Sequence, residues 1–310
     1  MNKYIEQEYK RIVSGKGYLE IPDWTVIQLT GEDRATFFHG FCTADIKGMT
    51  QGQVREAFVL NGKGRTIGHL NVLCLPESLL LIGPGGQAAE LMSHLDMYII
   101  RDDVQLLDQS SALRSFLIAS EPSPEIIDSL FGVSLEEGSC CVGNSGEMPF
   151  RLARAAFAGP CFWLGVSAEN ADEWVRSLDE MGISQVSQDA LEIFRLEHGT
   201  PWYARETTSL NLPQELNRDD LTISFTKGCY LGQEVVARID SLGRVNRLLV
   251  QMEFKDVEPL PGQDLVHDGK KVGKVTSVAS LVGRPGWKAM AFVKRELAKE
   301  GSLIGDGMVV

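Results

Sequence analysis

The sequence lacks the patterns that mark membrane, secreted and metal-binding proteins. Its 310 residues contain no apolar run near the roughly 20 residues that a membrane span needs. Residues 1–9 carry acids and no apolar signal-peptide core. The six cysteines form no CxxC pair, and the five histidines form no HxH or HExxH pair. These absences predict a cytoplasmic protein with free thiols and no resident metal site.

Charge provides a second exclusion. The chain has 30 Lys and Arg against 42 Asp and Glu, a formal net charge of −12. Binding to nucleic acid or to an anionic membrane needs basic surface, so this balance predicts neither a direct nucleic-acid partner nor a membrane partner. Residues 241–310 differ, with 11 Lys and Arg against 8 Asp and Glu, net +3. We interpret this mild excess as a solvated face, with a polyanion-binding role as the less favoured alternative.

The patterns that are present predict an α+β fold with two or three cores. Up to about residue 240, strand and helix patterns are mixed, and only short strands with turn signals follow, as in a small β-barrel. The expected strands are 24–29, 53–60, 66–75, 79–82, 104–107, 115–119, 161–166, 247–254, 264–267, 271–279 and 287–293. The expected helices are a short one through Phe38, 87–97, one capped by Ser123, one capped by Ser167 that ends near residue 182, and 188–198.

Two glycine-rich stretches allow different interpretations. Residues 61–64, Asn-Gly-Lys-Gly, join two strand patterns, and this predicts a tight hairpin turn in preference to a phosphate loop. Residues 83–86, Gly-Pro-Gly-Gly, link a strand to a helix and resemble a dinucleotide loop. Their spacing is not GxGxxG, and Pro84 removes a backbone N–H that such a loop would use, so this signal is weak.

The helix expected at 188–198 places an acid on its apolar face. At 100° per residue, Glu197 falls close to Ala190 on the helix. Burying a carboxylate there without a partner would cost free energy. Glu197 is therefore either a ligand-binding acid or the partner of an internal base or loop. The same helical wheel turns Arg195 away from the apolar face.

The irregular stretch 200–224 is too long for a simple connector and is expected to line or cover a site. Trp202 and Tyr203 either stack on a flat heterocycle or fill the edge of the core. Glu206 and Glu215 are expected to be solvated.

Residues 227–234, Lys-Gly-Cys-Tyr-Leu-Gly-Gln-Glu, are the hardest to explain by folding alone. Lys227 and a following helix N-terminus would both favour the thiolate of Cys229, which makes Cys229 the best candidate for a reactive sulfur. The alternative is that Cys229 is a small buried apolar residue between turn glycines.

This octapeptide resembles the K-G-C-Y-x-G-Q-E signature of the YgfZ family, relatives of the glycine-cleavage T-protein that bind folate and support iron–sulfur proteins. The likeness extends to 195–199 (Arg-Leu-Glu-His-Gly), 212–216, 38–40, 43–45 and 61–65, so it covers nearly the whole chain. It implies a T-protein-like α+β fold, with two lobes forming a central folate crevice and a C-terminal β-barrel. We accordingly expect a folate-binding region over 1–240, with its two lobes interleaved in sequence, and a barrel over 241–310.

The resemblance also implies roles for particular residues. Glu197 would hold the pterin of tetrahydrofolate or a derivative, and Trp202 would contribute to the same site. Lys227 would favour the Cys229 thiolate and also meet the folate tail, while Gln233 and Glu234 would fix the loop. The function implied is an accessory protein for assembly or repair of iron–sulfur clusters, whose clients include tRNA-modifying enzymes, so its link to tRNA would be indirect.

Two other functions remain as alternatives. A folate-dependent aminomethyltransferase like the T-protein would need a carboxylate pair near the reacting amine, but residues 66–70 read Thr-Ile-Gly-His-Leu. A neutral His69 does not supply a fixed negative charge, so we expect no conventional enzyme of this type. The other alternative is a pure binding module with an inert thiol.

Overall fold

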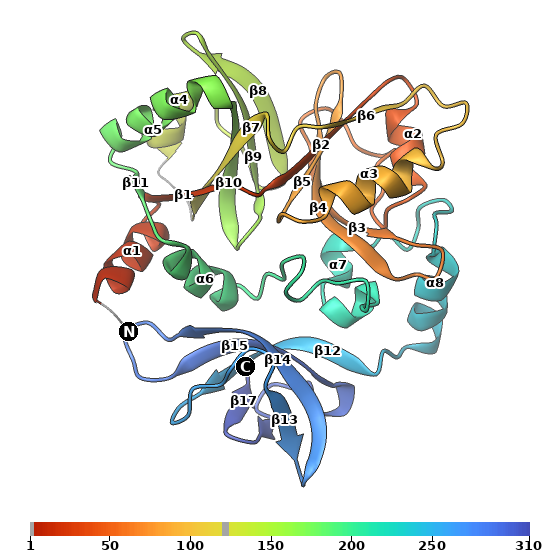
Figure 1. Cartoon of the computed structure of the whole chain (residues 1–310), viewed down its shortest axis with the longest axis vertical. Coiled ribbons are helices and arrows are strands. Elements are labelled where there is room, and N and C mark those ends of the chain that lie inside the picture. The colour runs from red at the N-terminus through yellow and green to blue at the C-terminus, as the bar shows by residue number, and fades with distance from the viewer. Residues whose placement is uncertain (1–2, 120–123) are drawn as a thin grey trace.

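The computed structural model describes residues 3–119 and 124–310. Its strands form three sheets, two side by side and a third below them, with helices and an irregular segment in the layer between (Figure 1). The N-cap expected at Ser123 lies outside the described residues. None of the helices within the described ranges is long and apolar enough to cross a membrane.

The first lobe is an antiparallel sheet of order β3-β4-β5-β2-β6. Its strands are β2 (Thr25–Thr30), β3 (Val54–Leu60), β4 (Thr66–Cys74), β5 (Leu79–Gly83) and β6 (Gln105–Asp108), and its helices are α2 (Arg34–His39) and α3 (Ala88–Asp96). Eight of the nine residues of β4 are buried, because helices cover one face and the rest of the molecule covers the other. The turn predicted at residues 61–64 is confirmed between β3 and β4.

The second lobe is a sheet of order β11-β1-β7-β10-β9-β8. Its strands are β1 (Gly17–Ile21), β7 (Leu113–Ala119), β8 (Ser139–Ser145), β9 (Met148–Ala156), β10 (Pro160–Ser167) and β11 (Ser184–Gln185), and its helices are α4 (Pro124–Phe131), the 3-10 turn η1 (Ala168–Asn170) and α5 (Ala171–Glu180). The chain thus enters this sheet through β1, builds the first lobe, and returns through β7. The strands β1, β8, β9 and β11 were not predicted.

The middle layer contains α1 (Lys3–Val13), α6 (Gln188–Glu197), the 3-10 turn η2 (Pro213–Leu216), α7 (Asp219–Thr222) and α8 (Gln233–Leu242). The start of α6 is as predicted, because the Ser187 hydroxyl accepts a hydrogen bond from the Ala190 amide at 3.3 Å. Helix α6 packs against α1 on one side and against strands β14 and β15 of the third sheet on another. Because α6 is covered on both sides, polar residues on its outer face are buried and need partners within the protein.

The third sheet has the order β13-β14-β15-β12-β17-β16 and is a nearly closed barrel. It comprises β12 (Arg247–Phe254), β13 (Asp264–His267), β14 (Lys270–Ser280), β15 (Trp287–Lys294), the 3-10 turn η3 (Arg295–Leu297), β16 (Leu303–Ile304) and β17 (Gly307–Val309). The four longer strands follow the expected ranges within one residue, and β16 and β17 were missed. The predicted α+β class with a C-terminal β module is confirmed, while the boundary at 240/241 stays a prediction.

Candidate functional site

The loop that precedes α8 is attached to the first lobe by Lys227. Its Nζ donates to the carbonyl oxygens of His39 at 2.6 Å, Cys42 at 2.8 Å and Ala44 at 2.7 Å. A lysine ammonium has three donors, so these three carbonyls use all of them. Burial lowers the pKa of Lys227, and the nearby Cys42 and Asp45 oppose that shift. The geometry therefore gives Lys227 a clamping role between segments far apart in sequence.

Gly232 brings the same loop against the β3–β4 turn. Its φ of +82° is in the left-handed region, and a Cβ there would lie 2.8 Å from the Asn61 carbonyl oxygen and 3.0 Å from the Gly64 Cα. The Leu231 amide donates to the Gly40 carbonyl at 2.8 Å. Three motifs that the sequence singled out separately, at 38–40, 61–65 and 227–234, thus meet in one place.

Cys229 lies at the exposed surface of this cluster, and it is a free thiol. The other cysteine of the cluster, Cys42, is fully buried. Burial raises the pKa of Cys42 to about 11 against the opposing charge of Lys227, so Cys42 stays a thiol at neutral pH. Cys229 is therefore the sulfur that solvent and a partner can reach.

Gln233 and Glu234 open α8 immediately after the loop. The backbone N–H of Gln233 donates to the Tyr230 carbonyl at 3.1 Å, and the Gln233 side chain is half-buried. Glu234 is exposed in the first turn, where its charge suits the positive end of the helix.

Glu197 is half-buried at the C-terminal end of α6. The hydroxyl of Tyr9, from α1, donates to its carboxylate, and Gln251 Nε2 donates to its backbone carbonyl at 3.0 Å. Burial, followed by the hydrogen bond to Glu197, raises the pKa of Tyr9, so Tyr9 remains a neutral donor. The acid thus has a protein partner, as its position on the apolar face required. It is not among the lining residues of the cavities described below, and neither is Cys229.

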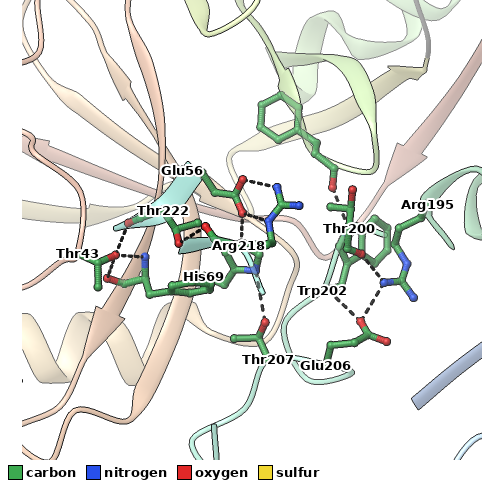
Figure 2. Close-up of polar contacts among 12 residues, drawn as sticks. Thr43, Glu56, His69, Arg195, Thr200, Trp202, Glu206, Thr207, Arg218 and Thr222 are labelled. Carbon is green, nitrogen blue, oxygen red and sulfur yellow. Dashed lines mark hydrogen bonds and ion pairs between the residues drawn. The ribbon is translucent and has the colours of Figure 1, made fainter. Parts of the chain in front are cut away.

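Arg195 corrects the helical-wheel prediction. It is fully buried and pairs with Glu192 at 2.6 Å and with Glu206 at 2.9 Å. Figure 2 shows its guanidinium turned toward Thr200 and Glu206, and it also donates to the Ser277 hydroxyl at 3.0 Å. The wheel failed because the side of α6 opposite its apolar face is covered by the third sheet.

The solvated acids predicted in the stretch 200–224 are also wrong. Glu206 has no exposed surface, because it binds Arg195 and accepts from the Ser277 hydroxyl at 2.5 Å. Glu215 is 7% exposed and pairs with Arg247 of β12 at 3.0 Å. Both acids connect the irregular stretch to the third sheet.

Trp202 is mainly a core residue. Its indole N–H donates to the Phe157 carbonyl at 2.9 Å, and the guanidiniums of Arg195 and Arg205 lie 5.4 and 5.6 Å from its ring centroid. Tyr203 is half-buried, with its hydroxyl donating to Glu90 at 3.1 Å. These contacts agree with the alternative in which the two rings fill the edge of the core.

A cavity of about 820 Å³ opens where the two lobes meet the start of α6. Its lining includes Trp24, residues 84–86, Gln188, Trp202, Tyr203 and Arg205. The glycine-rich stretch 83–86 is needed here for packing, since a Cβ on Gly85 would lie 1.9 Å from the Asp23 carbonyl oxygen. The volume and the mixture of aromatic and polar walls suit a small organic ligand.

A largely buried polar network, which the sequence did not predict, lies between β3, β4 and the segment before α7. Glu56 accepts from Arg218 Nε at 2.7 Å and Nη2 at 2.5 Å, and its Oε1 lies 2.6 Å from His69 Nε2 (Figure 2). Burial would raise the pKa of Glu56, but Arg218 and His69 outweigh it and lower that pKa to about 2. The available signal was a glutamate two residues into a strand pattern that ends in the apolar run 57–60.

This network borders a second cavity, of about 410 Å³, whose lining also includes Asp45, Asn71 and Thr222. A carboxylate does therefore stand beside His69, contrary to the reasoning from residues 66–70 alone. Its charge is balanced by the Arg218 guanidinium, so the pair supplies no free negative charge.

Within the described ranges, no group of three His, Cys, Asp or Glu side chains is arranged to hold a metal ion.

Comparisons with known proteins agree on the family. The GCVT N-terminal domain model matches residues 1–226. A protein named tRNA-modifying protein YgfZ, from Yersinia pseudotuberculosis, is 27% identical over 292 residues, covering 92% of this chain and 86% of the relative. A chloroplastic putative transferase from Arabidopsis thaliana is 26% identical over 304 residues, covering 91% of this chain. The chain spans only 66% of the length of that plant relative.

A solved structure gives the fold. The glycine cleavage system aminomethyltransferase T from Bartonella henselae superimposes with a TM-score of 0.87, covering 98% of this chain and 87% of that one. At 16% sequence identity, this likeness establishes a GcvT-like fold and nothing further. The chain belongs to the GCVT N-terminal domain family and is a YgfZ-type member of it. The predicted resemblance and the T-protein-like fold are thus confirmed, whereas the central folate crevice stays a prediction.

Proposed function

We propose that this chain is a folate-binding accessory protein that supports the assembly or repair of iron–sulfur clusters. The observation that carries the proposal is the meeting of the three family motifs around an exposed Cys229. Lys227 and the packed glycines hold the loop rigidly on the first lobe, yet leave the sulfur at the surface. A rigid loop with an accessible thiol suits transient contact with a partner protein or a cluster carried by it.

Two residues, Glu197 and Trp202, would contact folate in this proposal. Glu197 would accept hydrogen bonds from the pterin N–H groups after releasing the Tyr9 hydroxyl. Trp202 lines the 820 Å³ cavity, and because Glu197 lies outside its lining, a folate held by both residues would extend from this cavity toward the C-terminal end of α6. With its three donors already used, Lys227 acts on the site by positioning the loop, together with Gln233 and Glu234 at the start of α8.

The relatives named tRNA-modifying protein YgfZ connect this proposal to tRNA. We infer that the connection runs through iron–sulfur enzymes that modify tRNA and that the protein acts in the cytoplasm. In this scheme the cluster is cargo of a client protein, and the chain itself is not a conventional enzyme.

Titration with tetrahydrofolate tests the ligand. We expect saturable binding, followed by tryptophan fluorescence or calorimetry, that is lost in Glu197→Ala and weakened in Glu197→Gln. Glu180→Gln, which changes an exposed acid on α5, is the matched control and should bind like the wild type. Equal binding by all four proteins would remove Glu197 from the site, and no binding by the wild type would remove folate.

The role of the thiol needs a cellular measurement. Cys229→Ser should lower the activity of iron–sulfur enzymes in cells while the purified variant keeps its fold. Unchanged enzyme activity would favour an inert binding module.

The aminomethyltransferase alternative has its own assay. We expect no methylenetetrahydrofolate from the purified protein and an aminomethyl donor, because Glu56 is already neutralised by Arg218. Product formation that depends on Glu56 would reverse this ranking.

A further inference from the structure

A groove of about 670 Å³ lies where α8 ends and the third sheet begins. The register pairs Arg247 at the start of β12 with Lys294 at the end of β15, so the two chain segments that form the groove are adjacent (Figure 1). Besides Val245, its lining consists of four basic residues, one amide and one acid. These six polar residues are Arg244, Lys294, Arg295, Lys299, Asn246 and Glu296. All six are exposed.

Most of this positive charge has no acidic partner. In the described part of the chain, no carboxylate pairs with Arg244, Lys294 or Lys299, and Arg295 donates to the Gly243 carbonyl at 2.6 Å. Glu296 is the acid in the lining, and the exposed Asp240 and Glu300 are the nearest other acids along the chain. In contrast, the neighbouring Arg247 is paired with Glu215.

Contacts that stabilise the fold account for two of the four basic residues. Arg244 and Arg295 lie at the C-terminal end of α8, where positive charge complements the helix dipole. Lys294 and Lys299 have no such partner, and four like charges around one concave surface repel one another. The chain as a whole has a net charge of −12, so a concave surface with unpaired basic residues stands out from the rest of it. Such a surface attracts anionic ligands.

We propose that this groove binds consecutive phosphate groups, those of an RNA backbone or of a short polyphosphate. The expectation that nucleic acid does not bind directly rested on the charge of the whole chain. At physiological ionic strength, however, charges act over about 8 Å, so the local basic residues dominate at the groove. The proposal does not depend on folate or on Cys229.

Fluorescence anisotropy with the full chain and a fluorescein-labelled, mixed-sequence RNA of 20 nucleotides tests the proposal. Four phosphate contacts predict that raising NaCl from 50 to 200 mM weakens binding about 50-fold. The variant Lys294→Gln with Lys299→Gln should bind about 10-fold more weakly and lose about half of the salt dependence. Lys3→Gln with Lys16→Gln, the same charge change at exposed sites beside the second lobe, is the matched control.

Competition with tripolyphosphate separates the two sources of phosphate. Displacement of RNA only at a large excess supports an RNA backbone. Binding of tripolyphosphate without RNA binding, lost in the double variant, supports a small polyphosphate. The proposal is overturned if neither ligand binds at 50 mM NaCl, or if the double variant and the control bind alike.

Discussion

The buried ion pairs beneath the lobes and the exposed loop around Cys229 both carry polar residues, but they hold them in opposite ways. Arg195 and Glu206 are fully buried and compensate each other, and the largely buried Glu56 is compensated in the same way by Arg218. Cys229 stays in water on a loop held through Lys227 and backbone contacts. Substitutions in the first region are therefore expected to destabilise the fold, whereas the second region leaves its sulfur accessible to reagents and partner proteins.

The largest effect is expected in the buried network. Glu206→Ala leaves the fully buried Arg195 with Glu192 as its remaining carboxylate. Removing one partner of a buried ion pair costs several kcal/mol, and Glu192, which also pairs with Arg205, compensates Arg195 only in part, so we expect the free energy of unfolding in urea to fall by about 3 kcal/mol. The exposed Glu234→Ala should stay within about 0.5 kcal/mol. A loss below about 1 kcal/mol for Glu206→Ala would contradict the contrast between the two regions.

Glu56 should make stability depend on acid. Its folded-state pKa of about 2 lies below the ordinary value of 4.5, so the ionised form stabilises the fold above pH 4.5. That stability is lost as the pH falls from 4.5 toward 2. Between pH 6 and pH 3, the stability advantage of the wild type over Glu56→Gln should shrink by about 2 kcal/mol. A pH-independent difference would show that Arg218 and His69 do not hold the carboxylate.

Asp219, at the start of α7, should respond in the opposite direction. One of its carboxylate oxygens is buried without a hydrogen-bond partner in the part that the structure describes. Burial, followed by Asp220 and Asp240, raises its pKa to about 6, so its contribution to stability falls as the pH rises from 3.8 to 6. Allowing for solvent screening, Asp219→Asn should stabilise the protein by about 1 kcal/mol at pH 7 and by almost nothing at pH 3. Equal gains at both pH values would count against this reading.

The smallest stability effect is expected at Cys229. Cys229→Ser should change the free energy of unfolding by less than about 0.5 kcal/mol, since the side chain is exposed. Iodoacetamide should modify Cys229 well before the buried Cys42, whose pKa is about 11. Mass spectrometry of peptides after timed quenching measures both rates. Comparable rates would show that residues 227–234 readily separate from the first lobe and expose Cys42.

Local pattern was enough for several elements. Alternation and turn signals located the four longer strands of the third sheet, and a serine cap located the start of α6. The octapeptide at 227–234 identified the loop on which the other motifs converge. The short strands β16 and β17 carried too little pattern to be recognised.

Polar side chains were predicted less well because their environment depends on elements far away in sequence. A helical wheel assumes one buried face, yet α6 lies between α1 and the third sheet, so Arg195 is buried on the side expected to be solvated. Glu206, Glu215 and Glu56 became buried for the same reason, each next to a cation from another segment.

The sequence by itself determined the family, the α+β class and the loop that bears Cys229, since these depend on residue order and short-range periodicity. Only the tertiary structure decided which charges are paired and which lie free in the groove beside α8. Burial and pairing arise when distant segments meet, and their free energy is set by that geometry and not by the neighbours of a residue along the chain.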